Sequence, residues 1–183
     1  MPEYRRPRAK GGTFFFTVCT LERKPILTSD AMRMALRTAI RAVRTIHPFE
    51  IDAWVLLPDH LHCIWTLPEN DADFGLRWAI IKQEVTRQCA NVLHSGGRRS
   101  VSGIKRREAA LWQRRFWEHR IRDEADLSNH MDYLHWNPVK HGYAVRVLDW
   151  PYSTFHRFVA AGIHPEDWGG DDIGKRASGN YGE

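Results

Sequence analysis

The sequence predicts an α+β fold: a ferredoxin-like βαββαβ sandwich, in which an antiparallel sheet carries helices on one face, followed by a third helix. Three observations support this prediction. Strand-like and helix-like segments alternate in that order along the chain. Only a short break separates the second and third strands, as in an antiparallel hairpin. The 183 residues are enough for one domain with a sizeable core.

The first strand and the first helix are expected early in the chain. Residues 13–21 are rich in Phe, Thr and Val and follow two glycines, a pattern typical of a strand. Residues 30–46 follow a capping sequence, Thr28-Ser29-Asp30, and precede Pro48, which suits a helix. Apolar residues recur on one face of this helix, and the other face carries Arg33, Arg37, Arg41 and Arg44. The arginine face suits phosphate binding, although an ordinary solvated face gives the same pattern.

The middle of the chain predicts two strands and a second helix. Residues 49–57 and 60–67 are apolar strand segments separated by Pro58-Asp59. Asp71-Ala72-Asp73 offers a cap for a helix over about residues 73–93, whose apolar stripe consists of Phe74, Trp78, Ile81, Val85 and Cys89. In a βαββαβ sandwich the first and third strands are central, so residues 60–67 are expected in the middle of the sheet.

The last strand and the third helix are expected after residue 114. Residues 115–122 have the pattern of a fourth strand, and Asp123 can cap a helix from Glu124 to about Trp136. A residue that precedes proline is disfavoured in the α conformation. We therefore expect this helix to end at Asn137, immediately before Pro138.

Three segments of this single domain are expected to be flexible. Residues 1–12 form a basic arm, residues 94–110 a basic loop rich in glycine and serine, and residues 165–183 an acidic, glycine-containing tail. The arm and the loop suit contacts with phosphates, but a solvated tail and a plain insertion fit the same compositions equally well. The tail has the opposite charge, and we hypothesise that it folds over the basic surface.

Composition narrows the class of protein. A formal charge of +5 and a pI of about 9.3 favour a polyanionic partner, although a modestly basic protein without such a partner has the same charge. The sequence lacks a long apolar run and the pattern of a signal peptide, so no membrane association is expected. Cys19, Cys63 and Cys89 lack metal-site or disulfide spacing, which fits the reducing cytoplasm. No dimer seam is recognisable, so a monomer is expected.

Two histidines lie on the predicted third strand. Side chains alternate along a strand, so His60 and His62 point to one face while Leu61 and Cys63 point to the other. Two imidazoles on one rigid strand face can bind a single metal ion. A lone His-x-His is weak evidence, and two surface histidines on an edge strand are the ordinary alternative.

A polar stripe is expected on the third helix. It consists of residues at i, i+4, i+7 and i+11, namely Asp126, His130, Tyr133 and Asn137. A half-buried tyrosine whose hydroxyl makes one hydrogen bond is the ordinary explanation for Tyr133. His130 is expected to be an ordinary surface histidine, and no general base stands out.

Several motifs resemble one family. Asp59-His60-Leu61-His62 and residues 133–142, which begin with Tyr133 and contain Asn137-Pro138, resemble the single-tyrosine transposases of the HUH endonuclease class. The sequence is most similar to the REP-associated tyrosine transposases. Four further segments also resemble this subgroup: Tyr4-Arg5-Arg6, Gly11-Gly12-Thr13, residues 116–119 and residues 149–155. The match runs from about residue 4 to about residue 168, and the loop at residues 94–110 interrupts it.

The resemblance implies a transposase that cleaves single-stranded or hairpin DNA, leaving a 5′-phosphotyrosine and a free 3′-hydroxyl. Tyr133 matches the catalytic tyrosine of the family. The metal-binding positions, for Mg²⁺ or Mn²⁺, match His60, His62 and Asn137. The family reads its palindromic hairpins with residues that match Tyr4, Arg5 and Arg6. As further DNA contacts we expect Lys82 and Lys140.

Two alternatives use the same residues differently. A ferredoxin-like sheet also serves non-catalytic nucleic-acid-binding modules, although the aromatic motif of RNA-recognition domains is not visible here. A metal-dependent hydrolase with water as nucleophile would keep its activity in Tyr133→Phe and form no covalent adduct. Zinc is disfavoured, because Cys63 points away from the two histidines and no fourth soft ligand is at hand.

Overall fold

A four-stranded antiparallel sheet forms the middle layer of the computed structural model, which describes residues 11–90 and 111–169. The strands are β1 (Gly12–Cys19), β2 (Glu50–Leu56), β3 (His60–Leu67) and β4 (Trp117–Arg120). Their order across the sheet is β2-β3-β1-β4, and each neighbouring pair is antiparallel. The predicted ferredoxin-like order is confirmed, with the first and third strands in the centre.

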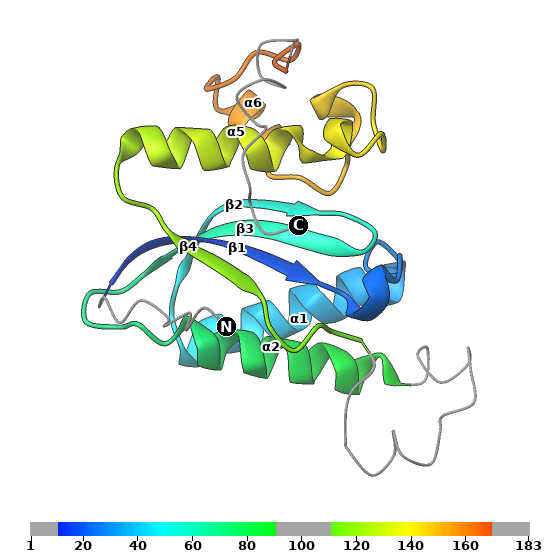
Figure 1. Ribbon diagram of the computed structural model, residues 1–183, viewed down its shortest axis with the longest axis vertical. Helices are drawn as coiled ribbons and strands as arrows, with labels where there is room; N and C mark the ends of the chain where they lie inside the picture. Colours follow the sequence, from blue (N-terminus) through cyan, green and yellow to red (C-terminus); the bar gives the residue numbers. More distant parts are fainter. Residues whose placement is uncertain (1–10, 91–110, 170–183) are drawn as a thin grey trace, which may run out of the picture.

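Helices cover both faces of this sheet (Figure 1). Helices α1 (Asp30–Ile46) and α2 (Phe74–Gln88) pack side by side on one face, and α5 (Glu124–Lys140) lies on the other. The short α6 (Phe155–Ala160) and two 3-10 turns, η1 (Leu21–Arg23) and η2 (Val147–Asp149), complete the described elements. The predicted sandwich therefore consists of the sheet with α1 and α2, and the third helix forms an additional layer.

The alternation of side chains along β1 supplies residues to two separate cores. Phe14 and Phe16 pack in the core beneath α1 and α2, where the rings of Trp65 and Trp78 stack with centroids 4.3 Å apart. Phe15, between them in sequence, packs in the core beneath α5. Side chains of successive strand residues point to opposite faces, so a single strand contributes to both cores.

Two of the three predicted helix caps form as expected. The carboxylate of Asp73 accepts a hydrogen bond from the backbone N–H of Leu76, at 2.9 Å, and Asp123 accepts one from Asp126, at 2.8 Å. Ser29 occupies the N-cap position of α1, but its hydroxyl donates to the carbonyl of Ile26 instead. The start of α1 at residue 30 nevertheless agrees with the prediction.

The predicted end of the third helix is wrong. Helix α5 continues past Asn137 to Lys140, with Pro138 inside its last turn. Proline removes one backbone donor, but the chain beyond it still bonds backwards: His141 N–H donates to the carbonyl of Asn137, and Tyr143 N–H donates to that of Pro138. Pro138 is also buried, so packing and these bonds outweigh the local preference of the residue before proline.

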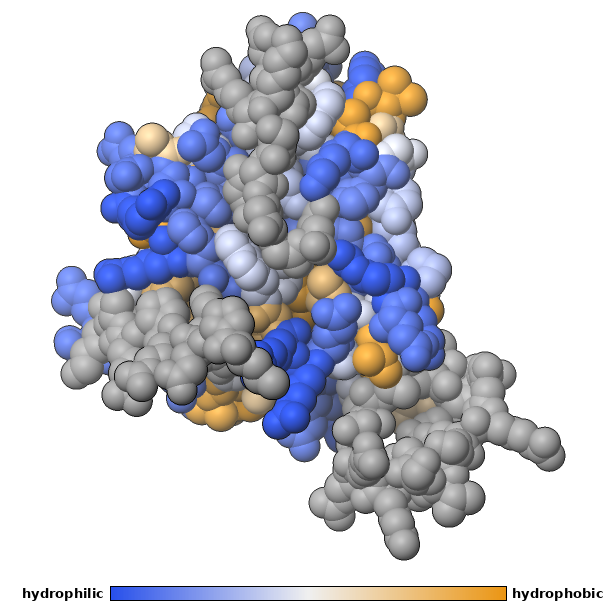
Figure 2. Space-filling view, viewed as in Figure 1, coloured by the Kyte–Doolittle hydropathy of each residue, from blue (hydrophilic) through white to orange (hydrophobic). Residues whose placement is uncertain are grey.

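The described surface on the side drawn in Figure 2 is mainly hydrophilic, with small, separate hydrophobic patches. Among the described residues, no helix is long and apolar enough to cross a membrane. The predicted basic arm at residues 1–10 and the loop at residues 94–110 lie outside the described residues. Of the predicted tail, Trp168 packs against Phe155 and His164, and residues 170–183 also lie outside.

Candidate active site

The two histidines of β3 lie on the face that α5 covers. His60 and His62 are buried, and their ring centroids are 4.9 Å apart. Leu61 and Cys63 point into the core on the opposite face. The alternation predicted from the sequence is therefore confirmed, and Cys63 is separated from the histidine pair by the sheet.

Each of these histidines is held through its Nδ1 atom. His60 Nδ1 lies 2.7 Å from Asp59 Oδ1, and His62 Nδ1 lies 2.8 Å from Thr17 Oγ1 on the neighbouring strand β1. Burial raises the pKa of Asp59, but the hydrogen bond with His60 and the charges of His60 and Arg23 together outweigh burial and leave the pKa below its ordinary value. The Asp59 carboxylate accepts a hydrogen bond from Nδ1–H, which leaves the lone pair of a neutral His60 on Nε2. If the Thr17 hydroxyl accepts a hydrogen bond from His62 Nδ1–H, the lone pair of a neutral His62 likewise lies on Nε2.

Tyr133 faces this histidine pair from α5. Its ring is fully buried, with its centroid 5.2 Å from that of His62 and 6.1 Å from that of Phe15. Lys140 Nζ donates a hydrogen bond to the Tyr133 hydroxyl at 3.3 Å and lies 4.8 Å from the centroid of its ring. The two residues are two helical turns apart, so this contact depends on the continuation of α5 past Pro138.

The last turns of α5 bring further polar residues to the same side. Asn137 follows Tyr133 by one turn and is fully buried. His141, at the C-cap of α5, places its ring centroid 5.2 Å from that of His60. The three predicted metal ligands thus come from two elements that face each other: His60 and His62 from β3, and Asn137 from α5.

A cavity of about 340 Å³ opens beside Thr17, at the end of β1 that the short strand β4 leaves uncovered. Arg115 and Trp117 contribute a cation and an aromatic ring to its wall. Thr17 also bonds to His62, so this cavity adjoins the residue that orients the histidine. Cavity and histidine pair therefore belong to one region of the molecule.

The two lysines predicted to contact DNA lie on opposite faces of the sheet. Lys140 contacts Tyr133 on the α5 face, as described, whereas Lys82 lies on α2, on the other face. Lys82 Nζ donates to the backbone carbonyl of Gln113 and lies 5.2 Å from the centroid of the Phe116 ring. Tyr4, Arg5 and Arg6 are outside the described residues.

His130 is not the surface histidine that the sequence suggested. It is 6% exposed, packs against Phe15 with centroids 5.0 Å apart, and stacks on His119 of β4 at 4.5 Å. Burial lowers the pKa of His130, and the neighbouring His119 lowers it further, against the hydrogen bond to the Asp126 carbonyl. A buried, neutral imidazole here packs α5 onto the sheet.

Asp126 is the centre of this second cluster. Its carboxylate accepts hydrogen bonds from His119 Nε2 at 2.8 Å and from Arg122 Nε at 3.0 Å. Burial raises the pKa of Asp126, but these bonds outweigh it and hold the pKa far below its ordinary value. Nitrogen and oxygen atoms of His119, Asp126 and His130 lie within 4.8 Å of one another, as in a metal site. The Arg122 guanidinium on the same carboxylate instead favours a salt-bridged clamp between β4 and α5.

Most of these supporting residues were not predictable from the sequence. Asp59 stands next to the histidines in sequence, and its carboxylate was a readable signal for an orienting partner. Thr17 and His119 are distant in sequence, and only the strand register brings them to His62 and Asp126.

Known proteins closely resemble this chain, although no protein-family model matches the sequence. It is 50% identical over 171 residues, 93% of each chain, to the REP-associated tyrosine transposase of Escherichia coli K12. It is 46% identical to a putative REP-associated tyrosine transposase of Haemophilus influenzae, over 93% of this chain and 95% of that protein.

A solved structure agrees with both comparisons. The structure of the REP-associated tyrosine transposase bound to a REP hairpin superposes with a TM-score of 0.81. It is 46% identical to this chain, and the match covers 100% of this chain and 98% of that one. With a shared fold and close to half of all residues identical over nearly the whole length, this chain belongs to the REP-associated tyrosine transposases, a class of DNA-transposing enzymes.

Proposed function

We propose that this chain is a metal-dependent single-strand DNA endonuclease and strand transferase that acts on hairpin DNA through a 5′-phosphotyrosine intermediate. The observation that carries the proposal is the position of Tyr133. The centroid of its ring lies 5.2 Å from that of His62, and its hydroxyl accepts a hydrogen bond from Lys140. A relative of the same fold is bound to a REP hairpin, which supports a hairpin substrate. The charge of +5 also suits a polyanion.

The proposed reaction is a transesterification. The Tyr133 hydroxyl oxygen forms a bond to phosphorus while the bond from phosphorus to the 3′-oxygen breaks, and the departing oxygen is protonated to a 3′-hydroxyl. A tyrosine with an ordinary pKa of about 10 is a weak nucleophile at neutral pH. The ammonium of Lys140 on its hydroxyl favours the phenolate. The covalent intermediate conserves one phosphodiester bond, so attack by another 3′-hydroxyl can rejoin DNA.

The residues around the histidine pair fit a divalent cation. In both His60 and His62 the Nδ1 atom is engaged by a neighbouring side chain, which suits Nε2 for a metal. Asn137 would add an amide oxygen, a ligand type that suits Mg²⁺ or Mn²⁺ rather than zinc. A cation bound there would polarise the scissile phosphate and stabilise the leaving oxygen.

A second tyrosine near the pair is a poorer candidate nucleophile. Tyr143 is 43% exposed and stacks on His141 with centroids 6.0 Å apart. Burial raises the pKa of Tyr143, and the nearby Asp59 carboxylate raises it further, whereas the neighbour of the Tyr133 hydroxyl is the Lys140 ammonium, a cation. This tyrosine therefore provides a matched control for Tyr133.

The decisive experiment is an adduct assay with labelled hairpin DNA carrying a single-stranded extension, in Mn²⁺ or Mg²⁺, resolved on a denaturing gel. We expect a covalent protein–DNA band that is retained in Tyr143→Phe and is absent from Tyr133→Phe and from reactions with chelator. DNA cleavage without a covalent band would instead identify a hydrolase that uses water. Binding without any cleavage would identify a non-catalytic DNA-binding protein.

The DNA interface is proposed to be electrostatic and to include Tyr4, Arg5, Arg6 and both lysines, Lys82 and Lys140. Affinity should then fall with salt concentration, with a log–log slope set by the number of phosphates neutralised. An affinity insensitive to salt would contradict this part of the proposal. A monomer acting on chromosomal DNA, and thus in the cytoplasm, is the state that we propose for the reaction.

A further inference from the structure

A second cavity lies on the other side of the sheet from Tyr133. Its volume is about 440 Å³, within the range of about 300–1,000 Å³ that is typical of small-ligand sites. Three segments form its walls: helix α1, the edge strand β2 and the chain that follows η2. The lining includes two arginines, Arg33 and Arg37, and two aromatic rings, Trp54 and Tyr152.

The edge strand and the segment after η2 hold this cavity in shape. The backbone N–H of Leu56 donates to the carbonyl of Tyr152, at 2.9 Å, and Val55 forms an antiparallel bridge with Ser153. The backbone N–H of Thr154 donates to the carbonyl of Trp54, at 2.8 Å. These backbone bonds fix the spacing of the two aromatic residues, so the cavity is preformed.

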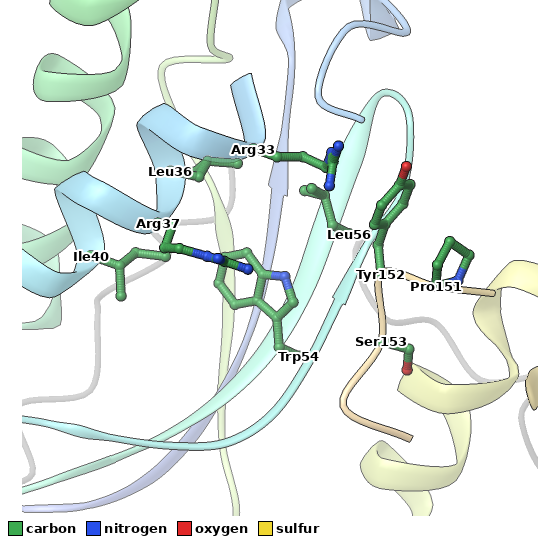
Figure 3. Close-up of a pocket in the computed structure, with 9 residues that line it drawn as sticks. All are labelled: Arg33, Leu36, Arg37, Ile40, Trp54, Leu56, Pro151, Tyr152 and Ser153. Carbon is green, nitrogen blue, oxygen red and sulfur yellow. The ribbon is translucent and has the colours of Figure 1, made fainter. Parts of the chain in front are cut away.

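The two arginines of the cavity differ in their charged neighbours. The guanidinium of Arg33 lies over the Tyr152 ring, 4.7 Å from its centroid, and is ion-paired with Asp30. In residues 11–90 and 111–169, no carboxylate lies within salt-bridge distance of Arg37. Figure 3 shows the Arg37 side chain reaching towards the indole of Trp54. Arg37 thus offers an exposed cation beside an aromatic face.

We propose that this cavity binds one unpaired nucleotide of the DNA substrate, with its base stacked on Trp54 or Tyr152 and its phosphate on Arg37. Aromatic faces accept any base, and arginine pairs with phosphate oxygens, so the chemistry of the lining matches a single-stranded nucleotide. Trp54 and Leu56 point to the α1 face of β2, while Val55 points to the α5 face. The cavity is therefore a separate anchor for single-stranded DNA, away from the tyrosine. This inference rests on the proposed function, which supplies the DNA.

Binding of two labelled hairpins tests the proposal. They share one stem, and only one carries a short single-stranded extension; a chelator prevents cleavage. Stacking on one aromatic side chain contributes about 1–3 kcal/mol, so we expect Trp54→Ala to weaken binding of the extended hairpin about tenfold. Binding of the blunt hairpin should change less than twofold.

A matched pair of variants isolates the role of Arg37. Arg41 lies one turn farther along α1 and does not line the cavity. We expect Arg37→Gln to weaken the extended hairpin severalfold more than the blunt one, and Arg41→Gln, with the same loss of charge, to affect both equally and by less than twofold. Equal effects of Arg37→Gln on both hairpins would overturn the proposal.

Crosslinking of the unaltered protein provides a second test that does not depend on folding of a variant. Iodouracil is placed in turn at each position of the extension, and peptides are mapped by mass spectrometry after irradiation. The proposal requires a crosslink to Trp54 or Tyr152 from at least one position, and crosslinks confined to other residues would refute it. Adduct formation by Tyr133 is scored separately. Extension-dependent binding without an adduct would refute the proposed reaction alone, and an adduct without crosslinks to these rings would refute the cavity alone.

Discussion

The two faces of the sheet are made by the same strands but have different interiors. Beneath α1 and α2 the interior is aromatic and apolar, with Phe14, Phe16 and the stacked pair of Trp65 and Trp78. Beneath α5 a smaller apolar core, which includes Phe15, lies beside buried polar and titratable residues, some of them joined by hydrogen bonds, as for His62 with Thr17. Burial of a polar group is costly unless it is hydrogen-bonded. One face is thus mainly a hydrophobic core, and the other also holds the candidate site residues in a hydrogen-bonded arrangement.

The largest expected effect is on stability, from the apolar face. Trp78→Ala removes a fully buried indole that stacks on Trp65, and we expect it to lower the free energy of unfolding by about 3–5 kcal/mol. Urea denaturation measures this change. Arg87→Ala, on the exposed side of the same helix, should change it by less than about 0.5 kcal/mol. A loss below about 1 kcal/mol in Trp78→Ala would contradict the division between the faces.

The next largest effect, also on stability, is expected at Asp126, which clamps β4 to α5. Asp126→Asn weakens charge-assisted hydrogen bonds from His119 and Arg122 and should cost about 2 kcal/mol of unfolding free energy. The pKa of Asp126 is depressed in the folded state, so its contribution is present above the ordinary value of 3.8 and is lost as the pH falls below that value. Denaturation of both proteins at several acidic pH values should show the difference shrinking. Glu124→Gln, at an exposed position of the same helix, is the control.

The metal binding proposed for the histidine pair provides a test of the geometry on the α5 face. Thr17→Val keeps the shape of the side chain but removes the hydroxyl that orients His62. We expect Mn²⁺ affinity, measured by calorimetry, to fall about 10- to 100-fold, as for other partners of metal-binding histidines. His62→Ala should abolish binding, and an unchanged affinity in Thr17→Val would assign Thr17 to packing alone.

The smallest expected effect is the pH dependence of His130. Its pKa is lowered by burial in the folded protein, so below pH 6.5 the unfolded chain binds more protons and the folded state loses stability. Between pH 7 and pH 5 the stability of wild type should therefore decrease more than that of His130→Phe. Parallel curves for the two proteins would contradict a buried, neutral His130.

The fold was predictable because its elements have strong local signals. The apolar stripe of α1, the capping carboxylates of α2 and α5 and the alternation on β3 each determine one element with little help from the rest of the chain. The end of α5 was mispredicted because burial of Pro138 is a tertiary effect. Lys140 reaches Tyr133 only through those additional residues, so the same error concealed a contact of the candidate site.

The alternation along β1 also limits how this protein can vary. Phe14 and Phe16 face one core while Phe15 and Thr17 face the other, and Thr17 pairs with His62 across the strands. Substitutions can change one side of β1 at a time. Insertion of a single residue before Thr17 would place Phe16 opposite His62, and deletion would place Val18 there, so either change would remove the hydroxyl from His62. Over evolutionary time, β1 should therefore accumulate substitutions but no change in length.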